Sequence, residues 1–191
     1  MDLGLDDYNT AYISFSAEIN PTTTEQLIAT ATQLIERGFN QLYFLFSTAG
    51  GSVMHGINIY NVLRGLPARM IFHNVGNVDS IGNAVFLAGD VRYACPHSTF
   101  MFHGVGFDCA TGTRIEQKNA QEMLGGIFAD QKRIADIMVE RTTIDSNEAS
   151  DLFKEARTKD STYAAVNGIV SDVRDVNIPP GSAIFSLVFQ R

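Results

Sequence analysis

The sequence of 191 residues has no tryptophan, only two cysteines, and fewer basic than acidic side chains: 14 Lys and Arg against 21 Asp and Glu. The net charge of −7 argues against nucleic acid or an anionic membrane as the main partner, because both are bound by clustered Lys and Arg. No apolar run reaches the roughly 20 residues that cross a bilayer. The cysteines, Cys95 and Cys109, lack the spacing of metal ligands, so no metal site is expected.

The first seven residues are acidic and lack the basic start and apolar middle of a signal peptide. Together with the low cysteine content this predicts a cytoplasmic protein, although one disulfide between Cys95 and Cys109 is left open. The length suits one substantial hydrophobic core, so we expect a single domain over residues 1–191.

Strand and helix patterns alternate along the whole chain. Apolar runs predict strands at residues 11–15, 41–46, 70–75, 93–94, 99–102 and 169–173. Apolar residues at helical spacing predict helices at residues 21–37, 55–66, 80–88, 114–141, 147–155 and 163–166. Such alternation predicts one α/β domain with a mainly parallel sheet and helices packed around it.

A glycine pair follows the second predicted strand, at a place where ligands gather in α/β folds. In the turn of residues 47–51, Ser-Thr-Ala-Gly-Gly, the glycines allow backbone N–H groups to approach a ligand at a helix start. The simpler interpretation is a tight strand-to-helix turn that needs positive φ.

Two further turns carry Ser80 and His103. Ser80 precedes a predicted helix, and the N–H of Ile81 behind it could face an oxyanion, but a serine there is more often an N-cap. A serine hydroxyl needs a neighbouring base to become a nucleophile. His103 ends a predicted strand and precedes Gly104, although a lone histidine in such a place is usually a satisfied core residue. Among the four histidines, only His103 combines this position with one downstream of Ser80.

In the order in which they occur along the chain, these turns and the segments around them resemble the caseinolytic-protease (Clp) proteolytic-subunit family. The resemblance covers about residues 12–175. Residues 47–53 are similar to its Asn-Ser-Pro-Gly-Gly turn, and residues 80–84 to its Ala-Ser-Met-Gly-Ala nucleophile segment. Residues 96–98 and 101–103 resemble its Pro-Asn-Ser and Met-Ile-His sequences, and residues 164–170 its closing Gly-Leu-Val segment.

The resemblance implies the ClpP/crotonase-like spiral of β-β-α units, with a protruding handle helix at about residues 114–141. It implies a serine endopeptidase with Ser80 as nucleophile, His103 as base, and the backbone N–H groups of Gly51 and Ile81 as oxyanion hole. It also implies no cofactor, a polypeptide substrate, and assembly of identical subunits into stacked heptameric rings.

Two features depart from the family pattern. Leu152 stands at the position of the family's catalytic aspartate, and Asp151 is one residue away, so we take Asp151 as the candidate third residue and a solvated helix charge as its alternative. Asp79 precedes the nucleophile where the family prefers a small residue, and its carboxylate would disfavour a second negative charge unless it points away.

The two ends of the chain also differ from the family. The stretch before Tyr12 lacks the apolar sequence with which the family meets its ATPase, so coupling to an AAA+ unfoldase is left open. Residues 176–191 have no counterpart in the family, and we expect either an added strand or a contact with a neighbouring subunit.

Three functions therefore remain under consideration. The first is a compartmentalised serine peptidase, which Ser80 and His103 favour. The second is a catalytically impaired ring subunit or scaffold, which Asp79 and Leu152 favour. The third is a crotonase-type acyl-CoA enzyme, which would use similar oxyanion donors without requiring the serine and histidine pair.

Overall fold

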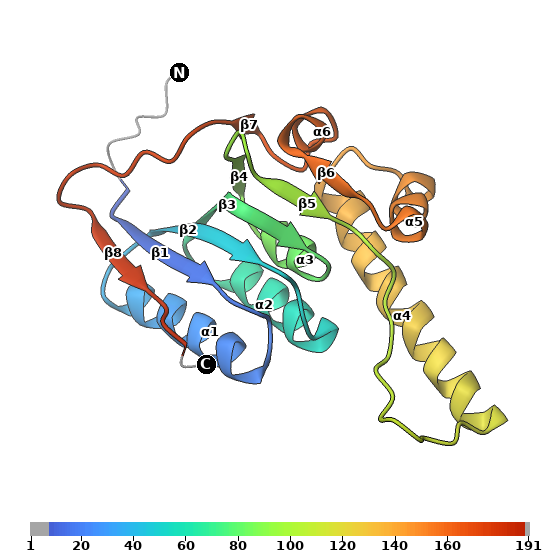
Figure 1. Ribbon diagram of the computed structural model, residues 1–191. Coiled ribbons are helices and arrows are strands. Elements are labelled where there is room, and N and C mark those ends of the chain that lie inside the picture. The colour runs from blue at the N-terminus through green and yellow to red at the C-terminus, as the bar shows by residue number, and fades with distance from the viewer. Residues whose placement is uncertain (1–7, 190–191) are drawn as a thin grey trace.

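The computed structural model describes residues 8–189. Residues 1–7 and residues 190 and 191 lie outside this part. The predictions about a signal peptide and about the segment that would contact an ATPase fall on residues 1–7. Within residues 8–189, strands and helices alternate from one end to the other (Figure 1).

The strands are β1 (Thr10–Ser16), β2 (Gln41–Thr48), β3 (Arg69–Asp79), β4 (Val91–Ala94), β5 (Thr99–Met101), β6 (Thr158–Asp160), β7 (Asp172–Val173) and β8 (Ala183–Ser186). The helices are α1 (Pro21–Glu36), α2 (Val53–Gly65), α3 (Gly82–Phe86), α4 (Gln117–Arg141), α5 (Ser146–Glu155) and α6 (Ser161–Val166).

The strands form one sheet in the order β6-β5-β3-β2-β1-β8, and β4 pairs with both β3 and β7. Every pairing is parallel except that of β5 with β6. This confirms the predicted α/β fold with a mainly parallel sheet. The carboxyl ends of β1, β2 and β3 therefore lie at one edge of the sheet. The predicted site residues lie in the turns that follow β2 and β3 at this edge.

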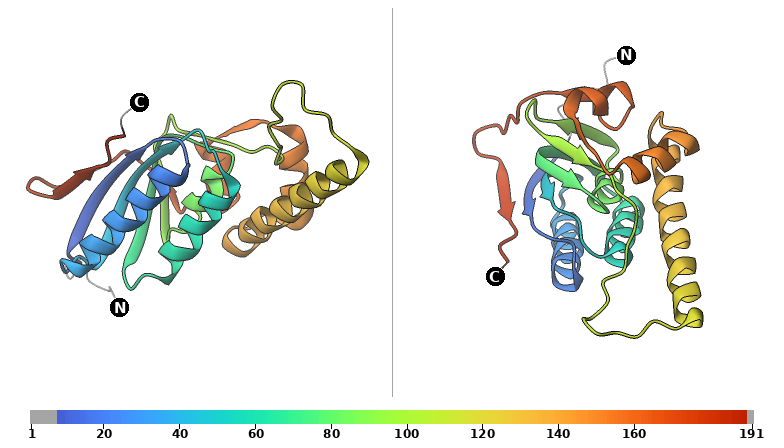
Figure 2. Two further views of the ribbon diagram at one scale, coloured as in Figure 1. Left: turned by 90° about the horizontal axis from the view of Figure 1, so that it is seen from below. Right: turned by 45° about the vertical axis from the view of Figure 1, so that its right-hand side comes forward.

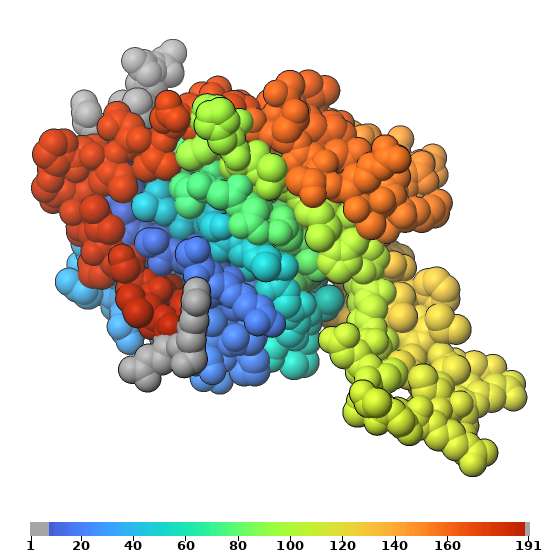
Figure 3. Space-filling model, viewed as in Figure 1, coloured from blue at the N-terminus to red at the C-terminus, as the bar shows by residue number. Residues whose placement is uncertain are grey.

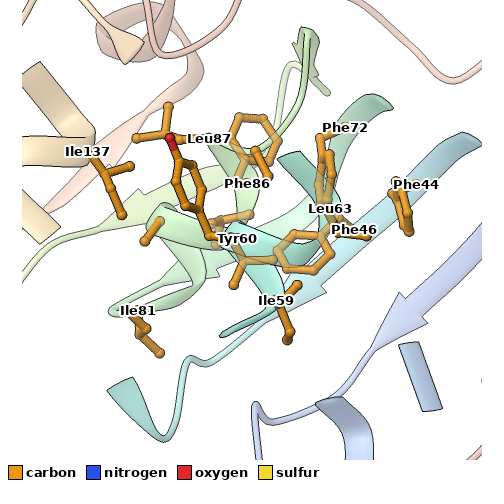
Figure 4. Packing of buried hydrophobic residues seen from close by; sticks show 14 of the residues in the cluster. Phe44, Phe46, Ile59, Tyr60, Leu63, Phe72, Ile81, Phe86, Leu87 and Ile137 are labelled. Atoms are coloured by element: carbon orange, nitrogen blue, oxygen red, sulfur yellow. The ribbon is translucent and has the colours of Figure 1, made fainter. Parts of the chain in front are cut away.

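The main core lies between the sheet and the helices α1 and α2, which cover the same face (Figures 1 and 2). Aromatic side chains dominate it: the rings of Phe44 and Phe72 stack with centroids 4.5 Å apart, and Phe86 meets Phe72 edge to face (Figure 4). A second apolar cluster of Tyr12, Tyr43 and Ile71 occupies the other face of the sheet.

Several elements differ from the sequence-based prediction. Strand β7 comprises only Asp172–Val173 of the predicted residues 169–173, and helix α4 begins at Gln117 rather than at residue 114. Strand β3 runs four residues past its expected end to Asp79, because it pairs with β4 along its first part and with β5 along its last. Helix α3 begins at Gly82 rather than Ser80, since Ser80 has a positive φ of 56° that no helical residue adopts. Strand β6 was not predicted, because its Thr-Lys-Asp sequence carries no apolar signal.

The segment without a family counterpart forms an added strand. Strand β8 pairs in parallel with β1, with Ala11 opposite Ala183 and Ser14 opposite Ser186. It extends the sheet beyond the strand that would otherwise be its edge (Figure 1).

Helix α4 extends away from the body of the molecule together with the loop that precedes it (Figures 1 and 3). Its buried residues, Ile134, Ile137 and Met138, all lie in its second half, whereas Leu124 and Phe128 in its first half are 51% and 65% exposed. None of the helices in residues 8–189 is long and apolar enough to span a membrane.

Candidate active site

A cleft of about 280 Å³ lies where β2, β3 and β5 end. Four residues singled out in the sequence line it together: Gly51, Ser80, Ile81 and His103. The rest of its wall is mostly apolar and consists of Val53, Phe102, Gly104, Val105, Gly106, Phe107, Asp108, Ile134 and Phe153. The fold thus brings residues from three separate turns to one hollow.

Ser80 occupies a sharp turn between β3 and α3. Its φ of 56° is rare for a residue with a side chain and costs about 1–3 kcal/mol, a strain that is concentrated at functional sites. The turn is held by the Ser80 N–H, which donates to the Met101 carbonyl over 2.8 Å. Helix α3 has no side-chain cap, so the interpretation of Ser80 as an N-cap is wrong.

Two backbone N–H groups beside Ser80 are available to an anion. In the described part of the chain, neither the Gly51 N–H nor the Ile81 N–H donates to any other group. The turn needs glycine: Gly50 and Gly51 have φ of 91° and 139°, and a Cβ on Gly50 would lie 2.6 Å from the Ser80 Cβ. The interpretation as a tight turn is confirmed, whereas the Gly51 N–H as an oxyanion donor stays a prediction that its free position at the cleft allows.

His103 is half-buried, and one of its nitrogens is anchored. Its Nδ1 lies 2.7 Å from the Gly104 carbonyl oxygen. A carbonyl only accepts hydrogen bonds, so Nδ1 carries the proton of the neutral ring and Nε2 keeps its lone pair for a base. Within residues 8–189 the Ser80 hydroxyl makes no hydrogen bond to this ring, a separation that is common in catalytic pairs without substrate.

The structure does not bring Asp151 to this cleft. Its carboxylate is 66% exposed and pairs with Lys154 over 3.1 Å, and it lines a different hollow beside α5. Leu152, at the family's aspartate position, is buried in the core. The partner of the His103 ring is therefore a backbone carbonyl, and Asp151 as third catalytic residue stays a prediction from the sequence.

The carboxylate of Asp79 is engaged away from the nucleophile. Its Oδ2 accepts a hydrogen bond from Asn77 Nδ2 over 2.6 Å, and Asn77 also bonds to Ser47 and to the Thr48 carbonyl. Asp79 does not line the cleft. Its charge is therefore compatible with an oxyanion next to Ser80.

Asn83 is a residue of the site that the sequence-based reasoning missed. It is only 2% exposed, and its Nδ2 donates both to the Ser80 carbonyl over 3.0 Å and to the Met101 carbonyl over 2.9 Å. It thereby ties the turn of Ser80 to the strand that leads to His103. The signal was a polar residue within an otherwise small and apolar helix.

His73 differs from His103 in its burial and in the hydrogen bonds of its ring. It is fully buried, its Nε2 donates to the Arg174 carbonyl over 3.0 Å, and its Nδ1 accepts from the Tyr43 hydroxyl over 2.7 Å. Burial lowers the pKa of His73 below its ordinary value of 6.5 and raises that of Tyr43 to about 12. His73 is thus a core histidine whose two ring nitrogens both have hydrogen-bond partners.

The sequence model of the Clp protease family matches residues 6–177. The chain belongs to the Clp protease family. The match ends before β8, so the added strand lies outside the part of the chain shared with the family.

Relatives and a solved structure agree with this assignment. The chain is 30% identical over 106 residues to an ATP-dependent Clp protease proteolytic subunit of Vitis vinifera, a match that spans about half of each protein (52% of this chain and 54% of the relative). It is 26% identical over 175 residues to the corresponding subunit of Pleurastrum terricola, covering 86% of each. A ClpP1 mutant from Listeria monocytogenes has the same fold, with a TM-score of 0.72, 20% identity, and coverage of 88% of this chain and 92% of that one.

Proposed function

We propose that this protein is a serine endopeptidase that cleaves unfolded polypeptides or peptides. The observation that carries the proposal is the single cleft that holds Ser80, His103 and the free N–H groups of Gly51 and Ile81. Membership of the Clp protease family supports the same activity and favours it over a crotonase-type acyl-CoA reaction.

In the proposed reaction the Ser80 hydroxyl attacks the peptide carbonyl carbon while His103 Nε2 takes the hydroxyl proton. The N–H groups of Gly51 and Ile81 bind the oxyanion that forms; one such donor is worth about two to three orders of magnitude in rate. The C–N bond then breaks, and His103 gives its proton to the leaving amine. Water releases the acyl group from Ser80 by the same route, with His103 again as base.

We further propose that the active form is a ring-shaped assembly of identical subunits, with rings stacked through α4. The exposed apolar side chains of Leu124 and Phe128 on the projecting half of this helix support the stacking, since a lone subunit would leave them in water. Coupling to an AAA+ unfoldase and a cytoplasmic location belong to the same proposal.

A catalytically impaired ring subunit is the second candidate, and one observation favours it. The His103 ring is oriented by the neutral Gly104 carbonyl rather than by a carboxylate, so the imidazolium that forms during attack is less stabilised. Loss of the acid from a catalytic triad can lower the rate by about four orders of magnitude.

Hydrolysis of a short fluorogenic peptide by the purified protein tests the two candidates. We expect turnover that Ser80→Ala abolishes, whereas Ser171→Ala, which changes an exposed serine outside the cleft, leaves it unaltered. Turnover that survives in Ser80→Ala would contradict the peptidase proposal, and absence of turnover in the wild type would favour the impaired subunit. Light scattering tests the assembly: a stable monomer would contradict it.

A further inference from the structure

One charged residue of the cleft has no part in the proposed reaction. Asp108 lines the cleft with Ser80 and His103, and it is the one Asp or Glu in that wall, which contains no Lys or Arg. In the described part of the chain its carboxylate forms no ion pair. The wall of the cleft that holds Ser80 thus carries one negative charge and no Lys or Arg to balance it.

The loop that carries Asp108 is held against α4. Residues 102–116 run from the end of β5 along that helix (Figure 1), and the ring of Phe107 lies close to Gly126, where an added Cβ would approach it to 3.3 Å. The Gly104 N–H, nearer the start of the loop, donates to the Phe153 carbonyl over 3.1 Å. These contacts keep the loop at the cleft, so Asp108 is presented to whatever enters it.

The rest of the wall suits a side chain that is apolar along its length and charged at its end. Val105, Phe107, Ile134 and Phe153 offer apolar surface for an aliphatic stem, and Asp108 offers a carboxylate for its head. Lys and Arg bury their stems in this manner while the charged group meets a partner. A volume of about 280 Å³ is small for a ligand pocket, which suits one or two residues of a chain rather than a larger ligand.

We propose that the cleft selects peptides with a Lys or Arg side chain beside the scissile bond, and that Asp108 determines this specificity. The proposal rests on the proposed peptidase function and names its substrate class. An acidic or uncharged side chain at that position would leave Asp108 without a partner, and the net charge of −7 further favours the approach of cationic chains.

The test uses peptidyl phosphonates that carry Arg, Leu or Glu at the position next to the reactive phosphorus, because they report on Ser80 without turnover. The Ser80 oxygen forms a bond to phosphorus, a phenoxide leaves, and the serine proton passes to the base. We expect the Arg probe to react about fivefold faster than the Leu probe, as one partly exposed ion pair allows, and the Glu probe to react slowest.

Asp108→Asn keeps the shape of the side chain and removes its charge. It should lower the ratio of the Arg rate to the Leu rate from about five to about one, and Asp108→Lys should favour the Glu probe. Glu36→Gln, which removes an exposed charge at the end of α1, is the matched control and should retain the wild-type preference.

The outcomes separate this inference from the proposed function. Reaction at Ser80 with equal rates for the Arg and Leu probes, or a preference that persists in Asp108→Asn, would overturn the role of Asp108 and leave the peptidase intact. Failure of every probe to react at Ser80 would overturn the proposed function itself.

Discussion

His73 lies within strand β3 and His103 in the loop just after strand β5, and the two histidines have opposite surroundings. Both nitrogens of His73 are engaged in a buried cluster. His103 has only Nδ1 engaged and borders a cleft that also holds Ser80. The first arrangement contributes to stability, and the second leaves a lone pair available for chemistry.

The largest effect on peptide hydrolysis is expected when the side chain of His103 is removed. His103→Ala should lower peptide hydrolysis by about 10²–10⁴-fold, because the general base is lost. Its free energy of unfolding should change by less than about 1 kcal/mol, since the half-buried ring makes a single hydrogen bond. Steady-state kinetics and denaturant unfolding measure the two effects. A large loss of stability with activity retained would reverse the roles given to the two histidines.

Removal of the other histidine should do the opposite. His73→Ala opens a cavity and leaves the Tyr43 hydroxyl and the Arg174 carbonyl unpaired in the interior, which should cost about 2–4 kcal/mol in the free energy of unfolding. Hydrolysis per folded molecule should remain within about threefold of the wild type. Tyr43→Phe, which breaks only one of these bonds, is the graded control and should cost about 1 kcal/mol.

The cluster around His73 should also make stability depend on pH. Burial lowers the folded-state pKa, so the unfolded chain binds a proton that the folded chain does not. The contribution is complete above pH 6.5 and is lost as the pH falls below it, so the free energy of unfolding should be lower at pH 5 than at pH 7. The groups around His73 are Tyr43, Tyr93, Cys95, Arg174 and Asp175.

Unfolding of His73→Gln at pH 5 and pH 7 measures this effect against the wild type. Gln keeps a hydrogen-bonding side chain and has no proton to gain, so the part of the acid sensitivity due to His73 should disappear. An unchanged difference between the two pH values would show that other groups cause it.

The smallest effect is expected at Asp151. Asp151→Asn should change hydrolysis by less than about threefold, because an exposed ion pair with Lys154 is worth little and the carboxylate lies outside the cleft. A fall of about three or more orders of magnitude in kcat would instead establish Asp151 as the third catalytic residue, brought to His103 by a rearrangement.

Much of the fold and part of the candidate site could be predicted from the sequence, because they depend on local patterns. The buried runs of β2 and β3 and the glycines at positions 50 and 51 indicated a parallel sheet with turns at one edge. The resemblance of the segments around Ser80 and His103 to the Clp family indicated the site. What the sequence alone could not decide was whether either residue was an ordinary N-cap or core histidine. That depends on φ and on burial, which are set by distant parts of the chain.

Other features were beyond the sequence because they arise from tertiary contacts. The carbonyl that accepts the hydrogen bond from His103 Nδ1 belongs to the backbone of Gly104 and carries no side-chain signal. The direction of the Asp79 carboxylate depends on Asn77, and the short strand β6 exists only because β5 offers it an edge. Asp108 comes to the cleft through the path of a loop rather than through a motif.

Labelling with a fluorophosphonate, followed by mass spectrometric mapping of the modified peptide, tests most directly that Ser80 is a nucleophile activated by His103. We predict one modified residue, Ser80, with a reaction rate that falls by at least about 100-fold in His103→Ala and stays near the wild-type value in His73→Ala. Modification of another residue, or of Ser80 at the same rate in all three proteins, would contradict the account.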